Sequence, residues 1–190
     1  MESARPAVFL DRDGTLIEEA GYPDRFERLV FYPYSVDAVR LFNRGGFAVI
    51  IVTNQAGVAR GIFPETFVAD AHRYLTGRLE RGGARVDGFY YCPHHPDASV
   101  PEYKRACDCR KPRPGLLTQA AADLNIDLTR SFVVGDRWHD IEAGQAVGAR
   151  SLLVRTGYGR TEEASRKPGV VPAATVDNLI AAASWILRAS

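Results

Sequence analysis

The sequence predicts an α/β protein built on a doubly wound, mostly parallel sheet, and three observations carry this prediction. Short apolar runs alternate with stretches of helical length and pattern along the whole chain, which is typical of βαβ units. The apolar runs are continuous rather than alternating, as in strands that helices bury on both faces. Several runs end at an acidic residue or a hydroxyl, and sheets of this kind bind ligands at the carboxyl ends of their strands.

The first element is a strand that ends in two carboxylates. An apolar run at residues 7–10 stops at Asp11 and Asp13, which a single residue separates, and Gly14 follows. Alternation along an extended chain directs both carboxylates to one side, and the glycine permits a sharp turn beneath them. One cation can therefore engage both acids. The alternative is a strand-end turn in which Asp and Gly only shape the backbone.

A polar, aromatic loop at residues 18–34 follows the first strand and is expected to overhang the strand ends. Ser35 is then a candidate cap for a helix that closes at Gly45. The uniform apolar run at residues 47–52 is the second strand, and it ends at Thr53, a residue type that by itself more often caps a strand than binds a ligand. The further expected strands are residues 86–91, 131–135 and 151–154, and the further expected helices are residues 64–79, 114–124, 139–147 and 176–187.

Length and charge limit the classes of function. With 190 residues and no linker, repeat or low-complexity tract, the chain is expected to form a single domain over residues 1–190, in which residues 160–172 are the loosest stretch. The formal net charge is +1, from 24 basic and 23 acidic residues, so no overall field attracts nucleic acid or a membrane surface. No apolar segment approaches the roughly 20 residues of a membrane span, and no signal-peptide core is present. We expect a cytoplasmic monomer with a small-molecule partner.

Three cysteines cluster with two histidines in one short segment. Cys92, Cys107 and Cys109 are odd in number, which favours a metal site over a disulfide framework. Cys92-x-His94 and Cys107-x-Cys109 offer four nitrogen and sulfur ligands with no vacancy, the donor set of a closed, structural zinc site. His95 competes with His94 as the fourth ligand. The alternative, buried thiols that pack as small apolar groups, suits this polar, proline-rich segment poorly.

The acidic strand ends resemble the haloacid dehalogenase superfamily of phosphatases. Asp11-Arg12-Asp13-Gly14-Thr15 looks like the first motif of that superfamily, and Thr53 at the end of the second strand matches the second motif. Lys111, Asp136 and Asp140 complete the set in the proper order. Each of these signals is weak alone, but their order over the whole chain makes coincidence an unlikely explanation.

The resemblance implies a catalytic role for Asp11, Asp13, Thr53 and Lys111. Asp11 would be the nucleophile that takes the phosphoryl group as an aspartyl-phosphate, and Asp13 would be the general acid and base. Thr53 and Lys111 would hold the equatorial oxygens of the transferring group. The reaction class is therefore hydrolysis of a phosphate monoester.

Magnesium is the cofactor that this set of residues favours. The carboxylates of Asp11 and Asp136 and the backbone carbonyl of Asp13 offer hard oxygen ligands, which Mg²⁺ prefers. Asp140 is expected to orient Lys111 or the waters of the metal rather than to bind the metal directly.

The cysteine segment narrows the resemblance to a zinc-containing branch of the superfamily. That branch comprises the D-glycero-D-manno-heptose 1,7-bisphosphate 7-phosphatases and, as their nearest relatives, the histidinol-phosphate phosphatases. The resemblance favours His94 over His95 as a zinc ligand and makes the zinc loop, residues 92–109, a scaffold for the loop that delivers Lys111. It is carried by Val52-Thr53-Asn54-Gln55, Tyr90-Tyr91-Cys92-Pro93-His94-His95-Pro96 and Cys107-Asp108-Cys109-Arg110-Lys111-Pro112.

Substrate selectivity is expected to come from loops, because the chain has no room for a large cap domain. Only about 40 residues separate the first motif from the second, and relatives that exclude water with a cap insert it there. In the fourth motif, Arg137 and Trp138 replace a Lys and a smaller residue that heptose enzymes often show, a departure that concerns the substrate rather than the reaction. The expected substrate-binding residues are Gly21, Tyr22, Asn54, Gln55, Arg110 and Arg137.

The leading functional hypothesis is removal of the 7-phosphate from a heptose 1,7-bisphosphate, on the route to nucleotide-activated heptose for lipopolysaccharide or another glycan. A histidinol-phosphate phosphatase is the alternative within the same class. A zinc-stabilised binding protein without turnover is the alternative from another class, and the full set of acids with Lys111 argues against it.

Overall fold

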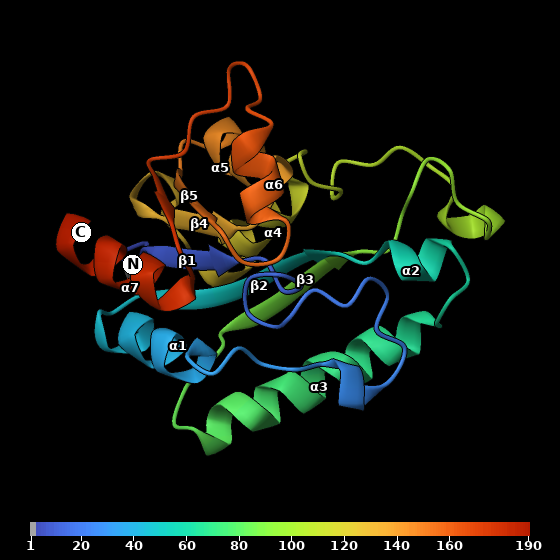
Figure 1. Cartoon of the computed structure of the whole chain (residues 1–190), viewed down its shortest axis with the longest axis horizontal. Coiled ribbons are helices and arrows are strands. Elements are labelled where there is room, and N and C mark those ends of the chain that lie inside the picture. Colours follow the sequence, from blue (N-terminus) through green and yellow to red (C-terminus); the bar gives the residue numbers. More distant parts are fainter. Residues whose placement is uncertain (1–2) are drawn as a thin grey trace.

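The computed structural model of the chain describes residues 3–190 and is built around a six-stranded sheet in the order β3-β2-β1-β4-β5-β6 (Figure 1). Every neighbouring pair of strands is parallel. This arrangement confirms the predicted fold class. The strands are β1 (Ala7–Leu10), β2 (Ala48–Asn54), β3 (Gly88–Cys92), β4 (Phe132–Gly135), β5 (Arg150–Val154) and β6 (Ala174–Val176).

Helices cover both faces of the sheet, with α1, α3 and α7 on one side and α4 and α5 on the other (Figure 1). Successive residues of β1 alternate between the two faces: Val8 and Leu10 pack in the core under the first group, and Ala7 and Phe9 pack under the second. None of the helices within residues 3–190 combines the length and apolarity that crossing a membrane requires. The helices are α1 (Ser35–Arg44), α2 (Ala56–Ala59), α3 (Glu65–Arg81), α4 (Gly115–Leu124), α5 (Trp138–Ala146), α6 (Gly159–Ala164) and α7 (Leu179–Ala189).

The strand order reverses at β1, and this reversal places the site. From β1 the chain moves outward to β2 and β3, then returns to the other side of β1 for β4, β5 and β6. The connections at the carboxyl ends of β1 and β4 therefore leave in opposite directions and open a crevice between them, where ligands bind in sheets of this type. No inserted domain separates β1 from β2 in the described chain, as expected.

The structure corrects several boundaries. The expected helix at residues 176–187 begins at Leu179, because residues 174–176 form β6 and the Asn178 side chain caps the helix by accepting from Ala181 N at 3.1 Å. The loosest stretch contains α6, and α2 was not expected; both are too short to show helical periodicity. Ser35 does not cap α1: it is the first helical residue, and its hydroxyl donates to the Leu16 carbonyl at 2.6 Å.

Candidate active site

An open cavity of about 270 Å³ lies at the carboxyl ends of β1 and β2. Three of the four predicted catalytic residues, Asp11, Asp13 and Thr53, line it. The fourth, Lys111, is only 3% exposed and lies directly beside Asp11, with its Nζ 2.8 Å from the Asp11 carboxylate. All the predicted substrate-binding residues line the cavity: Gly21, Tyr22, Asn54, Gln55, Arg110 and Arg137.

Lys111 is the central cation of the site. Its Nζ donates to Asp11 Oδ1 at 2.8 Å and to the Val52 carbonyl at 2.8 Å, and it lies 2.6 Å from Asp140 Oδ1. Burial alone would lower the pKa of Lys111, but the two carboxylates outweigh burial and raise it above its ordinary value. The lysine is therefore a permanent cation beside Asp11, and the expected link from Asp140 to Lys111 is present in the structure.

Three buried carboxylates, those of Asp11, Asp136 and Asp140, bring oxygen atoms within 4.8 Å of one another. Burial, followed by the charges of the other two acids, raises the pKa of Asp136 to about 9. Burial also raises the pKa of Asp11, to about 6, against the lowering effect of Lys111. Like charges held this close in a buried site call for a cation.

The contacts of the Asp136 carboxylate also indicate a site for a cation. Its Oδ2 accepts from the Tyr158 amide at 2.8 Å, but its buried Oδ1 has no hydrogen-bond partner among the described residues. Gly14, at φ +85°, packs so closely against this carboxylate that a Cβ would lie 2.2 Å from Oδ2, so only glycine fits. An orphaned carboxylate oxygen in a cluster of hard donors fits a magnesium ion.

Arg12 is a buried residue of the site that sequence reasoning treated only as the spacer between the two acids. It is 2% exposed, and its Nε and Nη2 donate to the two oxygens of Asp13 at 3.0 Å each. Gln55 Nε2 donates to Asp13 Oδ2 at 3.0 Å and to Thr53 Oγ1 at 2.8 Å, and Gln55 Oε1 accepts from Arg12 Nη2 at 3.1 Å. This network holds Asp13 and joins the ends of β1 and β2.

Asn54 connects β2 to the lysine loop. Its Nδ2 donates to the Lys111 carbonyl at 3.1 Å, and its Oδ1 accepts from the Lys111 amide at 3.1 Å. The nitrogen and the oxygen of the Asn54 amide group thus both hydrogen-bond to the backbone of Lys111. The side chain therefore fixes the position of Lys111, in addition to lining the cavity.

The loop at residues 18–34 overhangs the cavity as expected, and Glu19, Gly21 and Tyr22 form part of its wall. Phe26 anchors this loop on α3. Its ring stacks on Phe67, with the ring centres 5.6 Å apart, and on Tyr74, with the ring centres 5.2 Å apart. Elsewhere in the cavity wall, the guanidinium carbon of Arg137 lies 3.6 Å from the centre of the Tyr158 ring. Sequence reasoning missed Glu19, Arg60, His139 and Tyr158 as wall residues, because no motif marks them.

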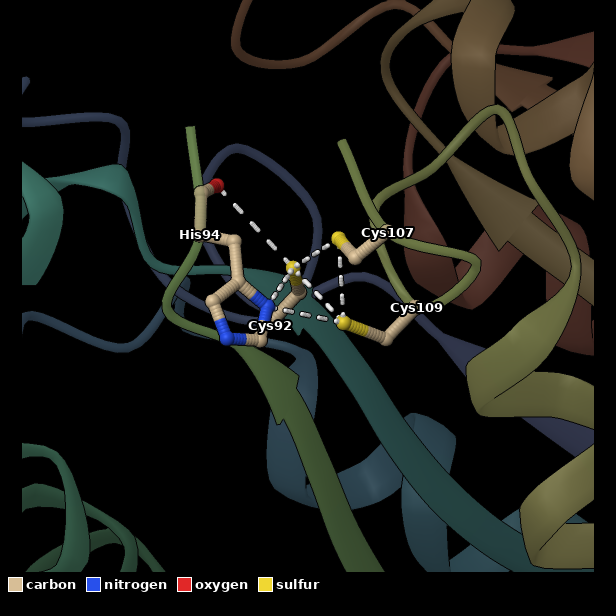
Figure 2. Close-up of side chains that lie close together, drawn as sticks. All are labelled: Cys92, His94, Cys107 and Cys109. Carbon is tan, nitrogen blue, oxygen red and sulfur yellow. Dashed lines mark hydrogen bonds between the residues drawn. The ribbon is translucent and has the colours of Figure 1, made fainter. Parts of the chain in front are cut away.

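The cysteines and one histidine form a second cluster (Figure 2). Cys109 Sγ lies 3.0 Å from Cys92 Sγ, 3.3 Å from Cys107 Sγ and 3.3 Å from His94 Nδ1. All three cysteines are free thiols. His95 does not face the thiols: its ring lines the cavity, and its Nδ1 accepts from the Asp97 amide at 3.0 Å. The three sulfurs and one nitrogen match the donor set of a structural zinc ion.

The second cluster is connected to the cavity through the chain that follows it. Arg110 and Lys111 come directly after Cys109, and Arg110 Nη1 donates back to the His94 carbonyl at 3.2 Å. On its outer side, the zinc loop is attached to α3 because the Tyr103 hydroxyl donates to Glu65 at 2.9 Å. The zinc loop therefore holds the residues that enter the active site without lining the cavity with its thiols.

Curated relatives match the chain over most of its length. D-glycero-beta-D-manno-heptose-1,7-bisphosphate 7-phosphatase from Yersinia pestis is 40% identical over 189 residues, which cover 99% of this chain and 93% of that protein. The enzyme of the same name from Escherichia coli strain K12 is 43% identical over 166 residues, which cover 86% of each chain. The first alignment covers nearly the whole chain and therefore spans the two clusters described above.

Solved structures show the same architecture. A D,D-heptose 1,7-bisphosphate phosphatase from B. bronchiseptica, complexed with magnesium and phosphate, superimposes with a TM-score of 0.86 at 30% identity and covers 97% of this chain and 99% of that one. The D,D-heptose 1,7-bisphosphate phosphatase from Burkholderia thailandensis gives a TM-score of 0.72 at 28% identity, with 96% and 99% covered. The HAD-hydrolase-like family model matches residues 108–182.

Proposed function

Because the chain belongs to the family of D-glycero-beta-D-manno-heptose-1,7-bisphosphate 7-phosphatases, within the haloacid dehalogenase-like hydrolases, we propose that it removes the 7-phosphate from a heptose 1,7-bisphosphate. The observation that carries the proposal is the position of Asp11, which meets the buried cation Lys111 at 2.8 Å and faces an open cavity. This arrangement suits a nucleophile that must approach an anion.

In the first step, a carboxylate oxygen of Asp11 attacks phosphorus, the bond from phosphorus to the sugar oxygen breaks, and an aspartyl-phosphate forms. Lys111 and the Thr53 hydroxyl hold the equatorial oxygens, and Asp13 gives a proton to the departing sugar oxygen. In the second step, Asp13 takes a proton from the attacking water, the water oxygen forms a bond to phosphorus, and the bond from the Asp11 oxygen to phosphorus breaks. Inorganic phosphate leaves, and Asp11 is restored.

Asp11, Asp136 and the backbone carbonyl of Asp13 would hold the magnesium ion. When bound, the ion supplies positive charge that offsets repulsion between the carboxylates and the incoming phosphate. The orphaned Oδ1 of Asp136 supports this assignment, as does the raised pKa of the same side chain. Asp140 would act through Lys111, which it contacts directly.

The zinc ligands would be Cys92, His94, Cys107 and Cys109, and the ion would have a structural role. Four protein donors close a tetrahedral site and leave no position for water or substrate. The zinc would stabilise the loop that presents Arg110 and Lys111 to the cavity. In this assignment His95 belongs to the cavity wall and does not bind the metal.

Arg110 would recognise the second, non-reacting phosphate or the sugar hydroxyls next to it. Its guanidinium lines the cavity, and one of its nitrogens is held by the His94 carbonyl. A planar fork of donors suits a phosphate better than a single ammonium does. Gly21, Tyr22 and Arg137 would complete the wall around the sugar, while Asn54 and Gln55 would act mainly on Lys111 and Asp13.

The test is a set of initial rates with Mg²⁺ on both anomers of heptose 1,7-bisphosphate, on heptose 7-phosphate and on histidinol phosphate. We expect the highest kcat/KM on one heptose bisphosphate, and the preferred anomer indicates whether an ADP-linked or GDP-linked heptose is the end product. Preference for histidinol phosphate would refute the heptose assignment. Absence of turnover on all substrates would refute the enzymatic one.

We further propose that the enzyme acts as a monomer in the cytoplasm. The three free thiols of the second cluster suit a reducing compartment, where zinc thiolates persist. Light scattering after size-exclusion chromatography should give a mass near 20.9 kDa. A dimer mass would contradict the first part of this proposal, and cell fractionation tests the second.

A further inference from the structure

Trp138 makes two hydrogen bonds to Glu162 that join α5 to α6. It is the first residue of α5 and is only 9% exposed. Its backbone amide donates to Glu162 Oε2 at 2.9 Å, and its indole Nε1 donates to the Glu162 carbonyl at 2.9 Å. The amide at the start of a helix has no partner within the helix, and here the Glu162 carboxylate supplies one. One residue of α6 is thus fixed at two points to the start of α5.

The same contacts lead back to a carboxylate of the active site. Asp136 lies two residues before Trp138, immediately after β4. The Glu162 amide donates to the Tyr158 carbonyl at 3.0 Å, and the Tyr158 amide donates to Asp136 Oδ2 at 2.8 Å. The contacts therefore form a closed cycle from Asp136 through Trp138, Glu162 and Tyr158 to Asp136 again. Within this cycle, the position of α6 sets the position of the amide that holds Oδ2.

The turn between β5 and α6 leaves no space beside this carboxylate. A Cβ on Gly157, at φ +53°, would lie 2.2 Å from Asp136 Oδ2 and 2.6 Å from Gly14 Cα. The Thr156 hydroxyl donates to the Gly14 carbonyl at 2.6 Å. Gly14 directly follows Asp13, whose backbone carbonyl is a proposed ligand of the magnesium ion. A shift of this turn would therefore displace both the Asp136 carboxylate and the chain at Asp13.

Trp138 acts on the site from outside the active-site cavity. Its neighbours Arg137 and His139 line that cavity, but Trp138 is not among the described residues of its wall. The Trp138 side chain instead packs in a separate apolar cluster with Ile141 and Leu153. Any effect of Trp138 on the site therefore passes through its hydrogen bonds, without contact to the substrate.

We propose that Trp138 is a positioning residue for the magnesium site, which it supports by fixing Glu162 and, through it, the Tyr158 amide. That amide holds Asp136 Oδ2, so that Oδ1, which has no partner among the described residues, stays oriented toward the cation. A hydrogen bond to the second oxygen of a ligating carboxylate orients the ligand and strengthens metal binding. The inference rests on the proposed function, because it takes the metal from the proposed mechanism.

The experiment removes each hydrogen bond of the cycle separately. Trp138→Phe keeps the aromatic ring but loses the indole N–H. Glu162→Ala loses the acceptor of the Trp138 amide, and Glu162→Gln keeps an acceptor oxygen there. Trp185→Phe is the matched control, because it makes the same substitution at a half-buried tryptophan of α7. The melting temperature is measured in EDTA and over a series of Mg²⁺ concentrations, and kcat is measured over the same series.

Trp138→Phe and Glu162→Ala should each raise the Mg²⁺ concentration needed for a given increase in melting temperature by about tenfold, a loss typical of outer-shell changes at a metal site. The Mg²⁺ concentration that gives half of the maximal rate should rise by the same factor. At saturating Mg²⁺, kcat should recover toward that of wild type. Glu162→Gln should restore most of the affinity, and Trp185→Phe should show the Mg²⁺ dependence of wild type.

A Trp138→Phe variant that melts earlier in EDTA but has an unchanged Mg²⁺ dependence would overturn the inference, because Trp138 would then support only the fold. An equal loss of Mg²⁺ affinity in Trp185→Phe would overturn it as well. A wild type that does not respond to Mg²⁺ would remove the proposed metal site together with the inference. If Mg²⁺ affinity depends on Trp138 but no heptose bisphosphate is hydrolysed, the inference stands and the heptose assignment falls.

Discussion

The carboxylate cluster and the thiol cluster can each hold a metal, but they are assembled in opposite ways. Asp11 follows β1, whereas Asp136 and Asp140 come from the end of β4 and from α5, far along the chain, and Asp11 lines an open cavity. The zinc loop supplies all its donors from within 18 residues, between Cys92 and Cys109, and none of its thiols is among the residues that line the active-site cavity.

This difference shows how donor chemistry and access together separate a reactive centre from a structural one. Hard oxygens beside a cavity leave room for a phosphate and a water, so their cation can take part in chemistry. Soft sulfurs and an imidazole that fill every position around their ion can only support the loop. The comparison predicts that changes in the first cluster affect the rate, and changes in the second affect stability.

The largest expected effect is that of Asp11→Asn on turnover. A carboxamide oxygen is a poor nucleophile and cannot form the aspartyl-phosphate, so kcat should fall by a factor of about 10⁴ or more. Phosphate release measures the loss, and circular dichroism checks that the fold persists. Asp37→Asn, which changes an exposed acid on α1, is the matched control and should stay within about twofold of wild type. Substantial phosphate release by Asp11→Asn would remove Asp11 as the nucleophile.

Asp13→Asn should lower the rate on a sugar phosphate by roughly 10²–10⁴-fold, the usual contribution of a general acid and base. The first step should lose much less with p-nitrophenyl phosphate, because that leaving group needs no proton. Rapid-quench measurements separate formation of the aspartyl-phosphate from its hydrolysis. A loss below about tenfold on the sugar phosphate would point to another proton donor.

In the thiol cluster, replacing a metal ligand should lower stability rather than the catalytic rate. Cys109→Ser removes one of four donors, so zinc content should fall and the free energy of unfolding should decrease by on the order of 3–5 kcal/mol. Wild type should retain one zinc per chain through EDTA treatment that removes Mg²⁺ and stops turnover. Elemental analysis and thermal denaturation measure both effects, and Cys109→Ser with Mg²⁺ should keep most of its kcat below its melting temperature.

Two histidine variants make this prediction sharper. His94→Gln should lose zinc, and His95→Gln, which changes the adjacent ring on the cavity wall, should keep it. Zinc loss from both variants, or from neither, would contradict the proposed ligand set. A disulfide between Cys107 and Cys109 in freshly purified, reduced protein would contradict it too.

The smallest expected effect is a pH dependence of stability in the carboxylate cluster without Mg²⁺. Burial and neighbouring acids raise the pKa of Asp136 from 3.8 to about 9, so between these values the folded state binds a proton that the unfolded state has lost. The free energy of unfolding should therefore decrease as pH rises from about 4 to about 9. Asp11, with a pKa raised to about 6, adds to the decrease at the acidic end.

Asp136→Asn tests this explanation. In EDTA at pH 8–9 the variant should be more stable than wild type by on the order of 2 kcal/mol, and at pH 4 the two should be equal. Mg²⁺ should raise the melting temperature of wild type most at high pH and leave the variant unchanged. A flat pH profile for wild type in EDTA would mean that the cluster is not under electrostatic strain.

Much of the fold could be predicted because its main strands are long enough, and apolar enough, to show their burial in sequence. Residues 7–10 and 47–52 were placed within two residues of β1 and β2 at each end. β6 was missed because its three residues are half-buried at the edge of the sheet, and pairing with β5 rather than a local pattern makes them a strand. α2 and α6 are short turns of helix held by their surroundings.

The predicted site residues also come together, but several of their contacts could not be foreseen. Asp11, Asp13 and Lys111 belong to sequence motifs by which they can be identified. Arg12 carries no such signal, since an arginine between two acids is more often a solvated spacer; only the fold buries it against Asp13 and Gln55. Arg60 likewise carries no motif, and it lies at the cavity wall beside the zinc loop only because that loop packs against the end of α2.

The sequence by itself determined the order of the longer strands and helices along the chain, the kinds of donor atoms in each cluster, and the reaction class that those donors suit. These properties depend on residue type and on neighbours a few positions away. The tertiary structure alone decided which donors meet: Lys111 reaches Asp11 across 100 residues, and Thr156 reaches the Gly14 carbonyl across 142. Contacts over such separations arise from packing of the whole sheet, so local sequence patterns cannot predict them.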